Sequence, residues 1–370
     1  MIDFIPILKY TYYFDITILC LILIALWQCH NGSILNSKSV FLNAQVGIIL
    51  LFILILYMGL RPNHYSFGDT IMYAKWFDSL QESNHDFSWT WHNEWGFHNL
   101  IQWFAIYSNR HLFFLTCSII YIGSLWLATI RIFKQYYYIP FLIILCMFTF
   151  WDYGVNGIRN GLGASLFILA ITYINRPIIM IAICIIAASF HNSIYIMICA
   201  GIISWYINNS KYYLYLWMFS IISSYFIGEQ IQSYLGEHLV IDGDLRLSGY
   251  LTGDNMIGET VKLTRGFRWD FLIYSSIPTI VGFYFIFRRN FKDEYYHWIY
   301  NIYLITNSFW IIIIRAAYSN RFAQISWFIM PLVLIYPFMK QRFWHNHEKV
   351  LGFAIIIFYA FTFYYNIWKI

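Results

Sequence analysis

The residues in this chain best suited to chemistry are arginines that stand at or just beyond the ends of long apolar stretches. A guanidinium is always charged, and its rigid fork of donors matches the oxygens of a phosphate group. The six arginines are Arg61, Arg159, Arg265, Arg268, Arg315 and Arg321. One interpretation is that each of them snorkels to the lipid headgroups. Their grouping on the external side, where positive charge is normally disfavoured, instead favours a pocket for a lipid-linked diphosphate.

Arg159 lies in the segment WDYGVNGIRNGLG, at the expected external start of an apolar span. A helix that begins there adds backbone N–H donors and a favourable dipole to an anion site. Gly157, Gly161 and Gly163 have no side chains, so we expect them to let a bulky ligand approach the backbone. Arg159 is therefore a leading candidate for diphosphate binding.

Three polar residues are candidates for acid or base catalysis. His191 stands between two apolar stretches in ASFHNS, and a polar residue at that depth indicates a functional site unless it caps a helix end. Glu94, in HNEWGFHN, and Asp69, which follows Gly68, are external carboxylates. Asp69 has the alternative role of an N-cap for the helix that follows it. Glu94 is accordingly the better candidate for a general base.

Motifs for metal or cofactor chemistry are missing from the sequence. It contains no P-loop, GxSxG, HExxH or CxxC pattern. Asp242-Gly243-Asp244 has the spacing of a DxD metal motif, but in a glycine-rich loop this spacing favours a turn. We expect no metal and no cofactor, so guanidinium groups must neutralise the leaving group. That requirement suits a substrate already activated as a lipid diphosphate.

The composition is that of a multi-pass membrane protein. Of 370 residues, 60% are hydrophobic and 11% are charged, and the mean hydropathy is +0.57, whereas soluble domains carry about 25% charged residues. The net charge of +5 is spread thinly, which argues against a nucleic-acid partner. The six cysteines form no CxxC pair and indicate neither zinc nor a disulfide framework. The start of the chain lacks a basic region and a clear cleavage site, so we expect its first apolar run to be retained.

The apolar stretches predict an all-α fold with about twelve transmembrane helices, organised as one transmembrane domain over residues 1–370. Only helices satisfy their own backbone groups in lipid when so many separate runs occur. The short pair 177–190 and 192–207 is either one broken helix or a tight hairpin. The expected spans are 12–29, 40–59, 111–131, 139–154, 158–174, 177–190, 192–207, 212–228, 269–287, 295–314, 319–339 and 350–368.

The charges of the connecting segments predict the orientation. One side holds 11 basic and three acidic residues, and the other holds 12 basic and 15 acidic residues, so the first side is expected to be cytoplasmic. Both termini then lie outside. Two long polar segments are external on this topology. Residues 60–110 include the amphipathic-helix candidate GDTIMYAKWFDSL, and residues 229–268 form a second loop rich in Gly and Asp.

Four segments resemble the EpsG-like branch of the Wzy-type bacterial polysaccharide polymerases, which are relatives of the O-antigen ligases. They are RPNHYSFGDTIMYAKWF with EWGF, then NGIRNGLGASLFI, then AASFHNSIYIM, and a late SNRF before a span. Asn160 stands where the family more often has glutamine, and the loop 229–268 matches no family segment. The family's residues map onto Arg61, Gly68, Asp69, Tyr73, Glu94, Gly96, Arg159, Gly161, His191, Ser193 and Arg321.

The resemblance implies a GT-C-like glycosyltransferase in the bacterial cytoplasmic membrane, with its active site at the outer face. Such enzymes use undecaprenyl-diphosphate-linked oligosaccharides as donor and acceptor, and a chain-length regulator is a further candidate partner. The donor diphosphate is expected on Arg159, Arg265, Arg268 and Arg321, with Arg61 and Arg315 as second choices. His191 or Glu94 would take the proton of the acceptor hydroxyl.

Other interpretations remain open from the sequence. A ligase or single-addition glycosyltransferase of the same fold would use the same site. A transporter for the lipid-linked repeat is disfavoured, because the chain shows no inverted repeat and its charges lie at the outer face. Four tryptophans either stack on sugar faces or belong to the interfacial aromatic belt. They are Trp89, Trp91, Trp95 and Trp103.

Overall fold

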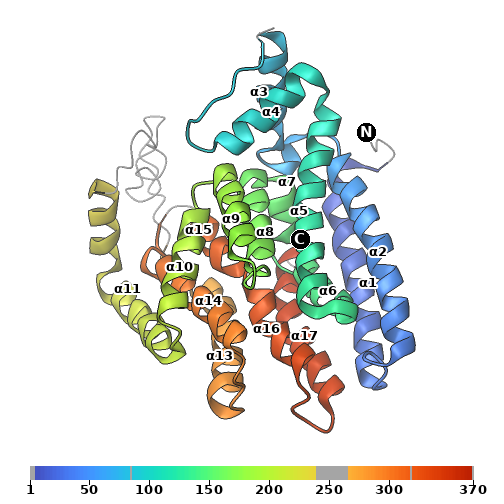
Figure 1. Cartoon of the computed structure of the whole chain (residues 1–370), viewed down its shortest axis with the longest axis vertical. Coiled ribbons are helices and arrows are strands. Elements are labelled where there is room, and N and C mark those ends of the chain that lie inside the picture. The colour runs from blue at the N-terminus through green and yellow to red at the C-terminus, as the bar shows by residue number, and fades with distance from the viewer. Residues whose placement is uncertain (1–4, 84–85, 239–265, 317–318, 369–370) are drawn as a thin grey trace. The chain divides into compact units, whose positions relative to one another are not determined.

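The computed structural model describes residues 5–83, 86–238, 266–316 and 319–368, and in these ranges every regular element is a helix (Figure 1). The predicted all-α class is therefore confirmed for the described part of the chain. Two compact units are present. The first comprises residues 1–195 with 338–370, and the second comprises residues 196–337.

The first unit contains the candidate site and is built from ten complete α-helices among its described residues. The pairs that pack together include α1 with α17, α2 with α5, α5 with α8, and α8 with α9. The helices are α1 (Tyr10–His30), α2 (Ser37–Gly59), α3 (Thr70–Glu82), α4 (Trp95–Tyr107), α5 (Arg110–Phe133), α6 (Tyr138–Leu145), α7 (Phe150–Val155), α8 (Ile158–Ile171), α9 (Pro177–Phe190) and α17 (His347–Phe363).

The second unit is also helical. Its helix α14 packs on α11, α13 and α15. Trp217 of α11 donates a hydrogen bond to Asn307 of α14 at 2.8 Å, and Trp298 donates one to the carbonyl of Gly201 at 2.9 Å. Two helices, α10 (Ile194–Tyr206) and α16 (Met330–Lys340), run from one unit into the other. Those that lie wholly in the second unit are α11 (Ser210–His238), α13 (Trp269–Phe283), α14 (Glu294–Ile312) and α15 (Ser319–Trp327).

Six described helical segments are long and apolar enough to cross a membrane, so the chain is a multi-pass membrane protein. Three further apolar helices, α8, α9 and α10, are shorter. The six segments are Ile7–His30, Ser37–Gly59, Arg110–Tyr136, Trp269–Arg288, Ser319–Lys340 and His347–Trp368.

The predicted span 139–154 differs from the structure, which has two short helices, α6 and α7, in this region. All eight residues of α6 are buried. A helix that is apolar on every face is either in lipid or inside the protein, and here protein supplies the apolar surroundings. The pair 177–190 and 192–207 forms two separate helices, α9 and α10, with His191 between them.

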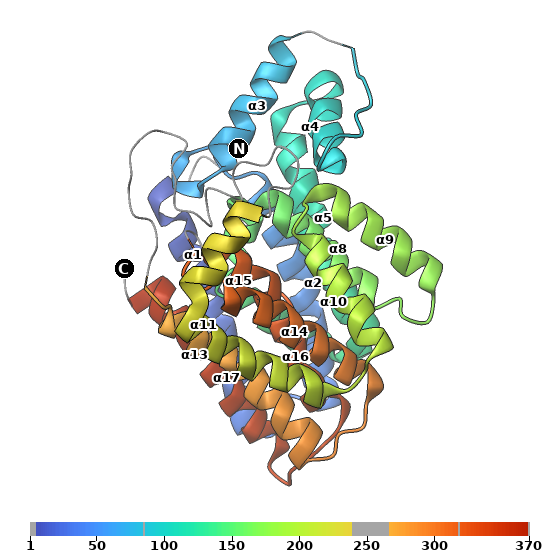
Figure 2. The same cartoon turned by 90° about the vertical axis from the view of Figure 1, so that its left-hand side faces the viewer.

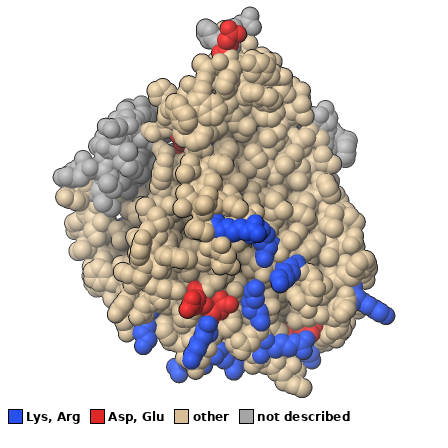
Figure 3. Space-filling model, in the orientation of Figure 1, with Lys and Arg blue, Asp and Glu red and all other residues tan. Residues whose placement is uncertain are grey.

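Residues 60–110 supply two helices, α3 and α4, that pack on each other at one end of the first unit (Figure 2). The buried residues of α3 are Thr70, Tyr73, Ala74 and Phe77, which recur at the spacing of one helix face. On the face drawn in Figure 3, lysine and arginine side chains gather in the lower part of the view, where Figure 1 shows the α1–α2 turn and the α5–α6 junction of the first unit. The sequence predicts both connections to be cytoplasmic.

Arg61 is a structural residue, which removes it from the predicted diphosphate site. Its side chain is 3% exposed, and it donates hydrogen bonds to the carbonyl of Met58, the hydroxyl of Thr70 at 2.6 Å and the carbonyl of Val155 at 3.2 Å. Met58 and Val155 lie at the ends of α2 and α7, where helix dipoles are negative. Burial lowers the pKa of Arg61 to about 10, so it stays charged at neutral pH. The guanidinium thus ties α2, α3 and α7 together.

Replacing this clamp should destabilise the first unit. Arg61→Met keeps most of the side-chain volume but leaves buried acceptors without their donor, which we expect to cost about 3 kcal/mol or more. The measurement is thermal unfolding of the purified protein. Arg110→Met is the matched control, because Arg110 pairs with Asp78 at 2.7 Å with both side chains partly exposed, and such pairs contribute about 0–1 kcal/mol. Equal melting temperatures for the two variants would contradict the clamp.

Candidate active site

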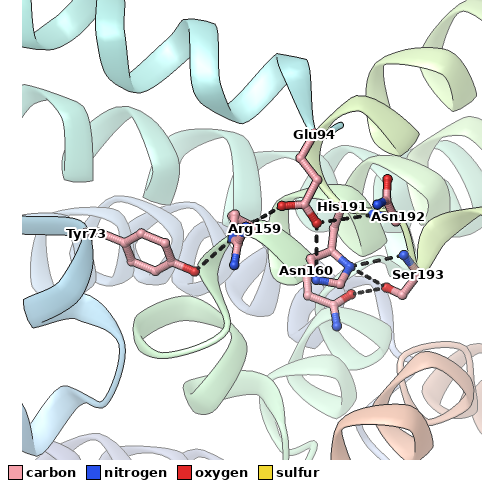
Figure 4. A network of polar contacts seen from close by, with 7 residues as sticks. All are labelled: Tyr73, Glu94, Arg159, Asn160, His191, Asn192 and Ser193. Atoms are coloured by element: carbon pink, nitrogen blue, oxygen red, sulfur yellow. Dashed lines mark hydrogen bonds and ion pairs between the residues drawn. The ribbon is translucent and has the colours of Figure 1, made fainter. Parts of the chain in front are cut away.

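Three of the predicted site residues converge at the junction of α3, α4, α8 and α9 (Figure 4). Arg159 lies in the first turn of α8, Glu94 precedes α4, and His191 follows α9. The Nη1 of Arg159 donates to Oε2 of Glu94 in an ion pair whose side chains are 23% and 12% exposed. The Nε2 of His191 lies 3.6 Å from Oε1 of the same carboxylate. Residues far apart in the sequence therefore form one polar network.

The guanidinium of Arg159 is held at two of its three nitrogens. Besides the bond from Nη1 to Glu94, its Nε donates to the phenolic oxygen of Tyr73 at 3.2 Å. Burial raises the pKa of Tyr73, and the nearby Arg159 opposes part of that rise, so the phenol is neutral. Among the described residues none accepts a hydrogen bond from Nη2, the nitrogen without a dashed line in Figure 4. Arg159 is thus fixed in direction with one pair of N–H donors open to a ligand.

The position of Glu94 depends on an uncommon backbone conformation. Its φ of 58° and ψ of 35° place it in the left-handed region, which costs non-glycine residues free energy. Its backbone carbonyl starts α4 by accepting bonds from the N–H groups of Phe97 and His98. The backbone nitrogen of Asn192 lies 3.5 Å from Oε1 of Glu94, the carboxylate oxygen that is not bonded to Arg159. Strain of this kind persists where surrounding contacts determine the backbone, and here it turns the carboxylate toward Arg159.

The surroundings of His191 assign its proton. The backbone N–H of Ser193 donates to Nδ1 at 3.1 Å, so Nδ1 carries the lone pair and the ring proton lies on Nε2. The Ser193 hydroxyl lies 2.8 Å from Nδ1 and 2.9 Å from the side-chain oxygen of Asn160. The N–H of Nε2 therefore faces Glu94, and the only lone pair of the ring is already engaged.

Three glycines, one in α4 and two in α8, lie where neighbouring segments pack too closely to leave room for a Cβ atom. A Cβ on Gly96 would overlap the Ser189 hydroxyl and come within 2.9 Å of its Cβ, so glycine lets α4 approach the end of α9. The expectation that Gly161 and Gly163 make room for a ligand is wrong. A Cβ on Gly161 would meet the carbonyl of Tyr153, and one on Gly163 would meet Ile194 at 2.6 Å. The chain's own atoms fill this space.

Asp69 lies outside this hydrogen-bonded network. It occupies the N-cap position of α3, as the alternative interpretation anticipates, but its side chain makes no cap hydrogen bond. Its backbone N–H donates to the side-chain oxygen of Asn156 at 2.8 Å. Gly68 precedes it with a φ of 59°, and a Cβ there would overlap Asn156. The Gly68–Asp69 pair is thus explained by a tight turn against Asn156.

The remaining predicted arginines fall in or beside the second unit. Arg265 lies outside the described residues. Arg268 forms a two-pronged pair with Asp270 at 2.9 and 2.7 Å, and its guanidinium lies 3.7 Å from the ring centre of Phe271. Arg315 contacts Glu229 at 3.4 Å, and Arg321 is the third residue of α15. Two of the predicted phosphate-binding arginines thus have carboxylate partners of their own.

Sequence reasoning missed two contributors to the network. Asn160 is adjacent to Arg159 and stands where the family more often has glutamine, and its side-chain oxygen accepts a hydrogen bond from the Ser193 hydroxyl. Asn192 acts through its backbone N–H. The signal was the run of three polar residues, His-Asn-Ser, between two apolar stretches. In the described part of the chain, no group of three His, Cys, Asp or Glu side chains is arranged to hold a metal ion.

The close approach of α4 to α9 can be tested at Gly96. Gly96→Ala should destabilise the protein by about 1–3 kcal/mol, because an extra methyl group is forced against Ser189. Thermal unfolding of the double variant Gly96→Ala/Ser189→Gly should recover part of the loss, since the hydroxyl and Cβ of Ser189 are removed. Gly123→Ala in α5 is the control, because a Cβ there meets nothing within 4 Å. A loss at Gly123 as large as that at Gly96 would contradict the steric argument.

Comparison with known proteins identifies the family. A family model for the EpsG family matches residues 45–370, a range that includes every residue of the network around Arg159. No curated protein and no solved structure matches the chain. The match covers far more than half of the sequence, and it agrees with the resemblance carried by the short motifs. The chain therefore belongs to the EpsG family of multi-pass membrane proteins.

Proposed function

We propose that this protein is a GT-C-like glycosyltransferase that polymerises undecaprenyl-diphosphate-linked oligosaccharide repeat units at the outer face of the bacterial cytoplasmic membrane. The proposal includes the topology of about twelve spans with residues 60–110 and 229–268 outside. Membership of the EpsG family supports it. The observation that carries it is Arg159, fixed at Nε and Nη1 with Nη2 open, beside a carboxylate and a histidine.

An arginine held in this way suits a phosphate oxygen. In the proposed reaction the acceptor hydroxyl attacks the anomeric carbon of the donor, and the bond from that carbon to the diphosphate breaks. The electron pair leaves on the phosphate oxygen, where a fixed guanidinium stabilises the developing charge. Arg159 supplies this donor from Nη2. Arg265, Arg268, Arg315 and Arg321 remain candidates for further phosphate contacts, and Asp69 remains a more distant candidate for acid or base catalysis.

Glu94 is better placed than His191 to act as the base. The lone pair of His191 is engaged by Ser193, whereas within the described ranges the Oε1 of Glu94 has only the long contacts to His191 and Asn192. The ion pair with Arg159 holds the Glu94 carboxylate beside the open Nη2. A donor diphosphate bound on Nη2 would therefore lie next to the carboxylate that accepts the hydroxyl proton.

Arg159→Lys is the first test of the phosphate site. One ammonium group cannot bond to Tyr73, Glu94 and a phosphate in the directions of the guanidinium fork, so we expect polymerisation to fall about 10²–10³-fold. The assay is the glycan ladder of a deletion strain complemented with each variant. Arg110→Lys, at a surface ion pair outside the network, is the control. A full ladder from normally expressed Arg159→Ala protein would rule out the diphosphate site.

The same ladder separates polymerase from ligase. A strain without a polymerase accumulates single repeat units, whereas a strain without a ligase accumulates polymer on the lipid carrier. Product formation by purified protein in detergent, where there is no membrane to cross, would exclude a pure transporter.

The choice of base makes a second prediction. Glu94→Gln removes the acceptor for the proton, so we expect turnover to fall about 10²–10⁴-fold. His191→Gln keeps an N–H donor for Glu94 and should lose much less. Turnover by the purified variants at saturating substrate is the measurement. The reverse order, with His191→Gln the more damaging, would assign the base to His191.

A further inference from the structure

Three tryptophans meet in the segment that leads into Glu94. The ring centres of Trp89, Trp91 and Trp95 lie 5.5, 5.7 and 5.2 Å apart in pairs. Trp89 is 52% exposed and Trp91 is 74% exposed. Large aromatic side chains usually bury most of their surface, because burial is their main source of stabilisation. Three of them held together while two stay exposed indicate a surface that binds something.

A buried amide holds the tryptophan segment in place. Asn99 of α4 is 4% exposed, and its side chain accepts a hydrogen bond from the N–H of Thr90 at 3.0 Å. It also donates to the carbonyls of Thr90 and Trp95, both at 2.8 Å. Thr90 lies between Trp89 and Trp91. One side chain therefore fixes the backbone that carries all three rings, and a preorganised surface loses little freedom when a ligand binds.

The polar residues of this segment fit a carbohydrate better than a bilayer surface. Ser88, His92 and Asn93 are exposed between and beside the rings. The ring planes are inclined to one another by 62°, 45° and 58°, so they face in different directions. A pyranose has an apolar C–H face, which meets the negative face of an aromatic ring, and a rim of hydroxyl groups that needs polar partners.

The charges nearby disfavour an anionic lipid surface. Asp86 precedes the cluster and Glu82 ends the preceding helix α3, and both are exposed, whereas Asp78 of α3 is paired with Arg110. Membrane-surface segments instead carry Lys and Arg beside their aromatic residues. Trp103 of α4 is 46% exposed, and its ring contacts are Phe104 and Tyr107, outside the cluster. Trp103 is therefore a suitable control, because it is an exposed tryptophan of α4, the helix that begins at Trp95, but is not part of the cluster.

From these observations we propose that Trp89, Trp91 and Trp95 form a carbohydrate subsite that stacks on sugar rings of the glycan. Trp95 follows Glu94 directly in the chain, so the cluster and the carboxylate belong to one connected segment. The identity of this glycan as a substrate rests on the proposed function. The subsite itself is a binding surface, and it can be tested without turnover.

The test uses saturation-transfer NMR on the full-length protein in nanodiscs. The probe is the repeat-unit oligosaccharide released by mild acid from the lipid carrier of a strain deleted for this protein. Irradiation of aromatic protons should transfer signal to the ring C–H protons of the sugar in the wild type. Trp91→Leu keeps an apolar side chain but removes the flat ring, and we expect it to weaken binding about three- to tenfold. Trp91→Phe should keep most of the binding.

The pattern across variants decides the proposal. Loss in Trp91→Leu, retention in Trp91→Phe and no effect of Trp103→Leu support the subsite. Equal binding by Trp91→Leu and wild type, or an equal loss in Trp103→Leu, overturns it in favour of a general membrane contact.

The proposed function fails separately from the subsite. Glycan binding that depends on Trp91, without any ladder from the wild type, keeps the subsite and removes the polymerase assignment. The opposite result is a glycan ladder that depends on Arg159 together with a Trp91→Leu variant whose glycan binding and acceptor KM equal those of the wild type. That result keeps the polymerase assignment and removes the subsite.

Discussion

The ion pair between Glu94 and Arg159 is the interaction on which the rest of the site depends. Two mostly buried charges require each other, because removing one leaves the other desolvated and unpaired at a cost of about 3–5 kcal/mol. The pair also joins the start of α4 to the start of α8. It orients the guanidinium and places His191 against the second carboxylate oxygen. A ligand that binds Arg159 must therefore lie next to Glu94.

The pair is possible because the surrounding helices approach closely. Gly96 lets α4 pack on Ser189 at the end of α9, which brings Glu94 near Asn192. Arg61 holds the ends of α2 and α7 to the first residue of α3, the helix that also carries Tyr73. Two arginines near helix ends thus differ in their contacts. Arg61 is enclosed and stabilises the fold, whereas the Nη2 of Arg159 has no acceptor among the described residues.

The sequence predicts the helical class, the family and the three residues of the ion network, because apolar runs and the motifs EWGF, IRNG and FHNS are local features. It does not predict which apolar runs meet lipid. The run around α6 is as apolar as a span, yet protein encloses it. Exposure also separates Arg61 from Arg159, and it depends on contacts made by residues such as Val155, far away in the chain. The sequence likewise suggests that Gly161 makes room for a ligand, whereas in the fold the carbonyl of Tyr153 occupies that space.

A single segment carries both the carboxylate and the tryptophan cluster, and this has a consequence for how the chemistry is positioned. Asn99 fixes Thr90 and Trp95, and the left-handed backbone of Glu94 lies between these anchors. Loss of this geometry would move the proposed base and the proposed sugar-binding surface together. The strained backbone at Glu94 is the conformation in which one connection presents both the carboxylate and the tryptophan cluster. A relaxed backbone there would satisfy local preference but turn the carboxylate away from Arg159.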